Sequence, residues 1–240
     1  RKNIDKGEQR ALLMSATGTG KTYASAFAMR ELGFKQVLFL VHRAQLAKQA
    51  KKSFEKVFNH SVSMGVVGDG KHEYDCDFVF AMIETLNRDK HLFQYEKEAF
   101  DCIILDEAHH SPANTYQKVM EYFTPRLFLG MTATPDKRDD HLEGRNVYEL
   151  FHYQIAHEIR LQKAMEDNLL CPFHYFGISD ITVINDKSLK NRTLSDTDFN
   201  LLTSEARVKH VIEQAEYYGN SGDRVKGLIF CSRNKECEIL

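Results

Sequence analysis

The sequence predicts an α/β fold in which a parallel sheet carries helices on both faces. Short, almost continuously apolar segments alternate with helical segments through the first half of the 240 residues, and strands of this kind are typical of parallel sheets buried on both sides. A glycine-rich turn joins the first apolar segment to the first helix. Polar motifs follow directly on several apolar segments, at the carboxyl ends of strands, where such sheets bind ligands.

The strands expected in the first half are apolar runs bounded by polar residues. They are Ala11–Ala16, Val37–Val41, Val62–Val67, Phe78–Ile83, Cys102–Leu105 and Leu127–Met131. The helices expected between them are Lys21–Leu32, which Gly33 ends, Ala44–Phe58 and Asn114–Phe123. Most apolar residues of Ala44–Phe58 lie near one face, which predicts that this helix packs on the sheet.

The pattern changes after Pro135, which predicts a second domain. The expected elements are a polar loop at Asp136–Arg145, a helical connector at Ala156–Asp167, a strand at Pro172–Ser179, an irregular segment at Asp180–Asp198, a helix at Leu202–Tyr218 and a buried strand at Gly227–Cys231. We therefore expect one domain over residues 1–167. Residues 168–240 are expected to begin a second α/β domain that is truncated inside a helix at Leu240.

Composition is that of an ordinary globular protein, with 42% apolar and 28% charged residues. The net charge of −2 gives no general electrostatic case for nucleic acid binding, so any such case depends on a local patch. No apolar run approaches the roughly 20 residues that cross a bilayer, so no membrane partner is expected. Five cysteines without a CxxC pair predict reduced core thiols in a cytoplasmic protein.

The segment Ser15–Thr22 (SATGTGKT) has the context and composition of a phosphate-binding loop. It follows an expected strand and opens an expected helix, so successive backbone N–H groups point at an anion. Lys21 is placed to meet the β- and γ-phosphates, and Thr22 can put its hydroxyl on Mg²⁺. Ser15 stands where the strict pattern has its first glycine. The predicted nucleotide-binding residues are Thr17, Gly18, Thr19, Gly20, Lys21 and Thr22.

The segment Asp106–His109 (DEAH) follows directly on an expected strand. An aspartate at a strand end can hold Mg²⁺, and the adjacent Glu107 can orient and deprotonate an attacking water. The competing interpretations are a solvated acidic turn and a metal site at His109 and His110.

Together these motifs resemble superfamily 2 helicases and translocases of the DEAH-box type, which have two RecA-like P-loop NTPase domains. The matching segments are ATGTGKT (Ala16–Thr22, motif I), LVHRAQLAKQ (Leu40–Gln49, motif Ia), DEAH (Asp106–His109, motif II), MTATP (Met131–Pro135, motif III) and GLIFCSRNKEC (Gly227–Cys237, motif IV). Within the superfamily, DEAHH, SPANTYQ and ELFHYQIAHEIR (Glu149–Arg160) look most like bacterial proteins related to type III restriction subunits.

The resemblance implies ATP and Mg²⁺ as cofactors, and DNA, or else RNA, as partner. It implies catalytic roles for Lys21, Asp106, Glu107 and His109, Mg²⁺ ligation by Thr22 and Asp106, and coupling to domain movement by Thr132, Ala133 and Thr134. It also implies that motif Ia contacts the nucleic acid backbone, for which His42 and Arg43 are the best candidates. The lysines of Ala44–Phe58 fit a solvated helix face equally well, and Thr85 is either a backbone contact or a helix cap.

Several features of the family pattern are missing. No adenine-recognition motif is identifiable, and motifs V and VI are absent. We therefore expect an excised piece that binds ATP, hydrolyses it weakly and does not unwind a duplex. The missing part is the C-terminal half of the second domain, and nuclease or accessory domains are possible attachments. The alternatives are another class of P-loop ATPase, such as a kinase or transporter ATPase, and an ATP-gated nucleic acid clamp.

Overall fold

The computed structural model describes residues 7–111, 114–135, 146–180, 196–219, 227–231 and 233–239. The chain divides into two compact units, Arg1–Pro172 and Phe173–Leu240, each described by itself below.

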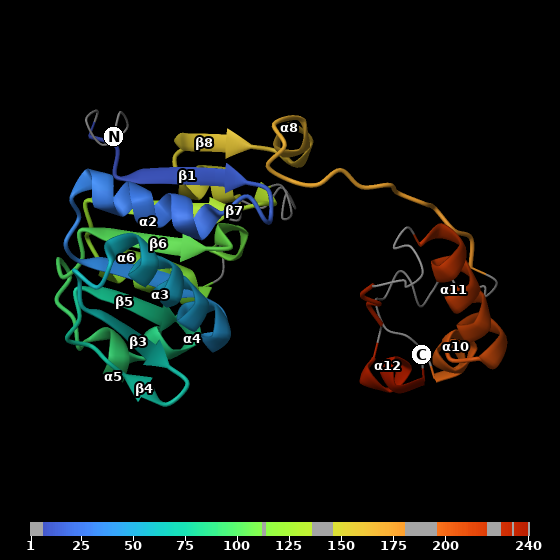
Figure 1. The fold of residues 1–240 in the computed structure, drawn as a ribbon. Coiled ribbons are helices and arrows are strands. Elements are labelled where there is room, and N and C mark those ends of the chain that lie inside the picture. Colours follow the sequence, from blue (N-terminus) through green and yellow to red (C-terminus); the bar gives the residue numbers. More distant parts are fainter. Residues whose placement is uncertain are drawn as a thin grey trace. The chain divides into compact units, whose positions relative to one another are not determined.

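The first unit contains an eight-stranded sheet in the order β4-β3-β5-β2-β6-β7-β1-β8 (Figure 1). The strands are β1 (Arg10–Ser15), β2 (Val37–Val41), β3 (Met64–Gly68), β4 (Lys71–His72), β5 (Phe78–Met82), β6 (Cys102–Asp106), β7 (Leu127–Thr132) and β8 (Ile155–Ile159). Only the short β3–β4 pair among these is antiparallel. The predicted fold class is confirmed, and the six strands expected in the first half end within two residues of their predicted bounds.

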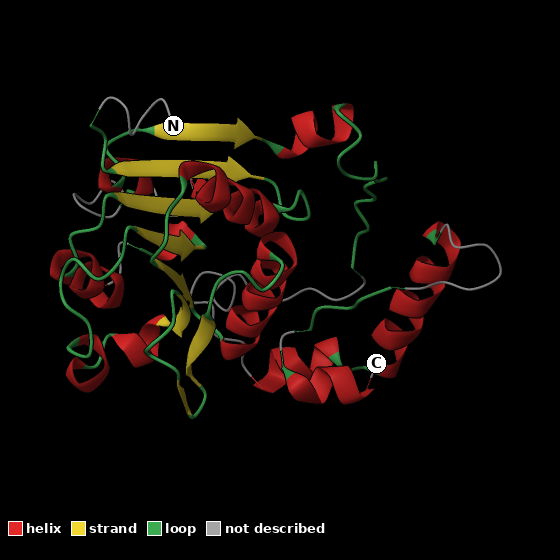
Figure 2. Cartoon of the chain, turned by 60° about the vertical axis from the view of Figure 1, so that its left-hand side comes forward, coloured by secondary structure: helices red, strands yellow, loops and turns green. Residues whose placement is uncertain are grey.

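Helices cover both faces of this sheet, as Figure 2 shows. One face carries α2 (Lys21–Leu32) and α3 (Ala44–Phe58), and the other carries α4 (Ile83–Leu86), α5 (Asp89–Leu92), α6 (Asn114–Tyr122) and α7 (Val147–Leu150). Because successive strand residues point to opposite faces, Phe39 packs with α3 in one core while Leu38 belongs to the other. The Phe39 and Phe54 rings meet edge to face at 5.6 Å. Two apolar cores therefore hold the sheet rigid between them.

The predicted helical connector Ala156–Asp167 is wrong in its first part. Residues Ile155–Ile159 form β8, and a helix, α8, begins only at Leu161 and ends at Glu166. β8 pairs in parallel with β1, and Ala16 donates a backbone hydrogen bond to Ile159 (2.9 Å). The strand forms because the edge of β1 offers backbone partners that the local sequence pattern does not reveal.

The second unit contains α10 (Asp196–Leu202), α11 (Glu205–Tyr218) and α12 (Asn234–Ile239). The helix predicted at Leu202–Tyr218 begins later, at Glu205, with Ser204 as its N-cap. The strands predicted at Pro172–Ser179 and Gly227–Cys231 are wrong, since neither segment is a strand and Phe230 is 93% exposed. A strand needs hydrogen-bonding neighbours, and the described part of this unit contains no other strand.

Some other sequence expectations have mixed outcomes. Asp136–Arg145, and residues 181–195 of the irregular segment, lie outside the described residues. All five thiols are free, but only Cys102 is buried, whereas Cys171 and Cys237 are exposed, so the expectation of core thiols holds for one of them. Among the described residues, no helix is both long and apolar enough to cross a membrane.

Gly130 in β7 allows close packing against a buried ring. A Cβ at Gly130 would lie 2.5 Å from Cζ of Phe151, which is fully buried. We expect Gly130→Ala to lower the free energy of unfolding by about 1–3 kcal/mol, because the aromatic ring must move within a packed core. Chemical denaturation measures this loss. Adding Phe151→Leu should recover part of it, and an unfolding midpoint equal to that of the wild type in Gly130→Ala would contradict the prediction.

Candidate functional site

The predicted motifs meet at the carboxyl edge of the sheet. Leu40 of β2 pairs with Leu105 of β6, Leu105 pairs with Gly130 of β7, and Met14 of β1 pairs with Thr132 of β7. These four strands are neighbours in parallel register, so the segments that follow them lie along one edge. The phosphate loop, DEAH, TATP and the start of motif Ia are therefore brought together.

The loop between β1 and α2 has the backbone of an anion cradle. Gly18 and Gly20 have φ values of 89° and 86°, a left-handed region that glycine adopts without strain. Gly20 is the N-cap of α2 and supplies no side-chain hydrogen bond, so the first N–H groups of the helix face the loop without a side-chain cap. A Cβ at Gly18 would also lie 3.1 Å from Leu170. This geometry suits phosphate binding at a helix N-terminus.

Ser15, which replaces the first glycine of the strict pattern, is part of the loop structure. Its buried hydroxyl is hydrogen-bonded to the Thr19 hydroxyl, and Thr19 also donates to the Ala16 carbonyl at 2.7 Å. The Lys21 ammonium donates to the Ser15 carbonyl at 3.0 Å. Thr22 is partly buried in the first turn of α2. A small hydroxyl residue at position 15 therefore ties the loop together and does not disrupt it.

Asp106 is a carboxylate in a desolvated position at the end of β6. Burial raises its pKa, the charge of Glu107 adds to the rise, and the charges of Lys21 and His42 oppose it. The Glu107 amide donates to its carboxylate at 3.1 Å. Lys21 therefore lies on the same side of the sheet edge as Asp106, although β1 and β6 are separated by β7. A carboxylate so placed favours a bound cation, and its oxygen ligands suit Mg²⁺.

Glu107 adopts a backbone conformation that is rare for a residue with a side chain. Its φ and ψ are 50° and 51°, in the left-handed region, which costs about 1–3 kcal/mol. The turn leads directly into a short 3₁₀ helix, Ala108–His110. There Oε2 of Glu107 lies 3.3 Å from Nδ1 of the buried His109.

A buried contact joins the DEAH and TATP segments. Nδ1 of His109 lies 3.0 Å from the hydroxyl of Thr132, and that hydroxyl accepts a hydrogen bond from the Thr134 amide at 3.1 Å. Ala133 lies between the two threonines and is partly buried. Of the three residues expected to couple hydrolysis to movement, Thr132 is thus in direct contact with His109, and Thr134 is bonded to Thr132.

The candidate nucleic acid contacts differ in exposure. Arg43 is exposed and is the N-cap residue of α3, directly after the partly buried His42. Among the lysines of α3, Lys48 pairs with Asp69 at 2.8 Å and Lys51 with Glu55 at 3.8 Å. Thr85 is partly buried inside α4, whose N-cap is Met82, so the interpretation of Thr85 as an N-terminal cap is wrong.

Two further residues, Tyr116 and His110, lie near the carboxylates, and the sequence assigns neither of them a role in nucleotide chemistry. The Tyr116 hydroxyl of α6 is buried and has no hydrogen-bond partner among the described residues, and burial together with the charges of Asp106 and Glu107 raises its pKa. The His110 ring lies 4.1 Å from that of His109 and 5.9 Å from that of His42. The sequence considers His110 only as a possible metal ligand and gives Tyr116 no role, because the contacts of both residues come from elements distant in the chain.

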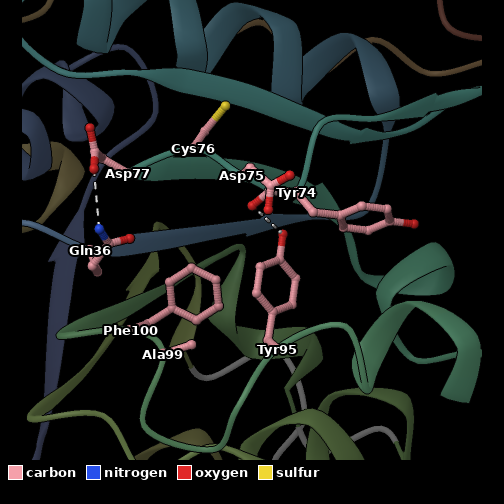
Figure 3. Close-up of a pocket in the computed structure, with 8 residues that line it drawn as sticks. All are labelled: Gln36, Tyr74, Asp75, Cys76, Asp77, Tyr95, Ala99 and Phe100. Atoms are coloured by element: carbon pink, nitrogen blue, oxygen red, sulfur yellow. Dashed lines mark hydrogen bonds between the residues drawn. The ribbon is translucent and has the colours of Figure 1, made fainter.

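A separate cavity of about 260 Å³ lies at the opposite edge of the sheet, where β2, β5 and β6 begin (Figure 3). It is lined by Gln36, Tyr74, Asp75, Cys76, Asp77, Tyr95, Ala99 and Phe100. The lining includes two acids and no basic residue, so it repels a triphosphate. Asp77 is engaged by Gln36 at 3.1 Å. The cavity is not the nucleotide site.

Comparisons with known proteins agree with this arrangement. Irc3 of Saccharomyces cerevisiae, whose name assigns it to the ATP-dependent helicases, is 28% identical over 235 residues, covering 88% of this chain and 32% of its own. The endonuclease subunit of the type I restriction enzyme EcoAI of Escherichia coli is 25% identical, covering 95% and 30%. The chain thus spans about a third of the length of these relatives.

Among solved structures, the helicase domain of Hef from Pyrococcus furiosus matches with a TM-score of 0.52 and 22% identity, covering 65% of this chain and 36% of that one. At this identity the match supports the RecA-like fold. The family model "Type III restriction enzyme, res subunit" matches residues 1–137, more than half of the chain. The chain belongs to the family of type III restriction enzyme res subunits, within the superfamily 2 helicases.

Proposed function

We propose that the protein is an ATP-driven motor that moves on nucleic acid, as a helicase or translocase, and that DNA is its substrate. The observation that carries the proposal is the meeting of the phosphate loop and the DEAH carboxylates at one sheet edge. The restriction enzyme subunits among its relatives favour DNA over RNA. We place the protein in the cytoplasm, where its free thiols stay reduced.

In this function each site residue has a defined task. The amides of Thr17–Thr22 and the Lys21 ammonium bind the phosphates, while Thr22 and Asp106 hold Mg²⁺. Bound Mg²⁺ would neutralise charge on the phosphate oxygens. Glu107 orients the attacking water and accepts its proton. The contacts that join His109, Thr132 and Thr134 couple ATP hydrolysis at this site to the backbone that follows Thr132.

Residues 168–240 are proposed to begin a second RecA-like domain. The motif IV resemblance of Gly227–Cys237 supports this. The 240 residues alone are expected to hydrolyse ATP weakly, because they contain no motif VI. An arginine finger of the kind found in related NTPases can contribute a factor of about 10³–10⁵ to the rate. Nuclease or accessory domains are the proposed partners in the whole protein.

The test is ATP hydrolysis by the protein that carries this chain, measured with single-stranded DNA, duplex DNA and RNA in parallel. DNA should stimulate turnover more than RNA. Equal turnover with and without every nucleic acid would defeat the motor proposal.

Arg43→Ala should weaken stimulation by DNA, because its guanidinium stands exposed beside the uncapped start of α3. We expect a higher DNA concentration at half-maximal stimulation. We also expect the slope of DNA affinity against salt concentration to fall by about one, the contribution of one phosphate contact. Lys56→Ala, in the last turn of the same helix, is the matched control and should behave as the wild type. Equal shifts in both variants would remove Arg43 from the proposed interface.

A further inference from the structure

The rings of His42, His110 and His109 follow one another in contact, next to Asp106 and Glu107. The His42 ring meets the His110 ring at 5.9 Å with an interplanar angle of 61°, and the His110 ring lies 4.1 Å from that of His109. His109 in turn contacts Thr132 and Glu107. The chain of contacts runs from the end of β2, through the 3₁₀ helix after β6, to the end of β7.

Packing against neighbouring side chains holds the His42 ring, which is one end of this series of ring contacts. Nδ1 of His42 is buried and has no hydrogen-bond partner among the described residues. The orientation of the His42 ring therefore depends on neighbours such as His110 and not on a hydrogen bond at Nδ1. The next residue, Arg43, is exposed and begins α3. Because the two residues are adjacent in the chain, a phosphate bound at Arg43 would lie one peptide unit from His42.

The strand register places His42 close to the DEAH segment. Leu40 is paired with Leu105, so His42 and Glu107, each two residues further on, occupy equivalent positions past the ends of neighbouring parallel strands. His109 and His110 are adjacent residues of one 3₁₀ helix, and their ring centroids lie 4.1 Å apart. The left-handed backbone at Glu107 fixes where that turn begins. A shift of the His110 ring would therefore press on the His109 ring, whose Nδ1 lies 3.3 Å from Oε2 of Glu107.

We propose that His110 is a positioning residue that transmits nucleic acid binding at His42 and Arg43 to His109, and through it to Glu107 and Thr132. The inference deepens the proposed function and rests on it. Its basis is the three-ring contact, the hydrogen bond between His109 and Thr132, and the buried Nδ1 of His42. His110 does not itself touch ATP or nucleic acid in this scheme. His110 determines how strongly nucleic acid binding changes the rate of ATP hydrolysis.

The experiment compares the ratio of DNA-stimulated to basal ATP hydrolysis in the protein that carries this chain. His110→Ala should reduce that ratio about tenfold, within the range of coupling between sites, with DNA affinity unchanged in a direct binding assay. His110→Phe keeps an aromatic ring in the stack and should restore most of the ratio. His60→Ala, an exposed histidine just after α3, is the control and should leave the ratio at the wild-type value.

A double-mutant cycle provides an independent measurement. If His42 and His110 belong to one contact chain, His42→Ala combined with His110→Ala should lower the ratio no further than the more damaging single change. Thermal unfolding of each variant shows that the fold is retained. A wild-type ratio in His110→Ala, an equal loss in His110→Phe, or additive effects in the cycle would overturn the inference. Absence of stimulation in the wild type would overturn the proposed function as well, which separates the two failures.

Discussion

Replacing Glu107 with glutamine is expected to lower the rate of ATP hydrolysis by about 10²–10⁴-fold, the contribution typical of a general base. The amide keeps the size and the reach of the side chain but does not accept a proton from water. Binding of ATP should persist, because the phosphate loop follows β1 and Lys21 begins α2, whereas Glu107 follows β6. Single-turnover hydrolysis and binding of a fluorescent ATP analogue measure the two effects separately.

Lys21→Ala is the contrasting variant for that experiment. It removes a phosphate contact, so it should weaken nucleotide binding itself, whereas Glu107→Gln should leave a protein that holds ATP and does not consume it. The pair also tests the clamp alternative. If both variants retain the wild-type rate of hydrolysis and normal function, the motor assignment fails and an ATP-gated clamp becomes the better interpretation.

Phe151→Ala is expected to reduce the free energy of unfolding of the first unit by about 3–5 kcal/mol, the usual effect of deleting a buried aromatic ring. Phe151 is fully buried and lies against Gly130 of β7, in the core that includes Phe128 and Met14. The cavity left behind would loosen the strand that ends at Thr132. Denaturant titration monitored by far-ultraviolet circular dichroism measures the loss.

The control for this measurement is Phe93→Ala, since Phe93 is 60% exposed and loses little buried surface on truncation. Its unfolding free energy should stay within about 0.5 kcal/mol of the wild type, as is usual for surface substitutions. Similar destabilisation by both variants would show that Phe151 is not a principal support of the sheet.

The sequence predicts the sheet well where strands are buried on both faces, because their apolar runs are unambiguous. Val37–Val41 and Ala44–Phe58 are found with their predicted bounds. It fails where a strand depends on a distant neighbour. The edge strand Ile155–Ile159 is mostly exposed, so its sequence has no apolar run, and its partner β1 is about 140 residues earlier in the chain.

The site shows the same division. The loop and the DEAH segment are local motifs, and their residues could be named from spacing and neighbouring elements alone. The contacts of His110 with His42 and the placement of Tyr116 beside Asp106 join elements that are far apart in sequence. Such pairs follow from strand order and helix packing, which a motif does not encode. The role of Ser15 is similar, because its bond to Thr19 appears only once the loop is closed.

The left-handed backbone at Glu107 lowers the stability of the fold at the position that carries the proposed catalytic base. Glycine at this position would relieve the strain, and removing such a conformational penalty commonly stabilises a protein. It would also delete the carboxylate beside Asp106. The gain in stability would therefore come with the loss of the group proposed to activate water, so at this position the strained backbone accompanies the catalytic side chain.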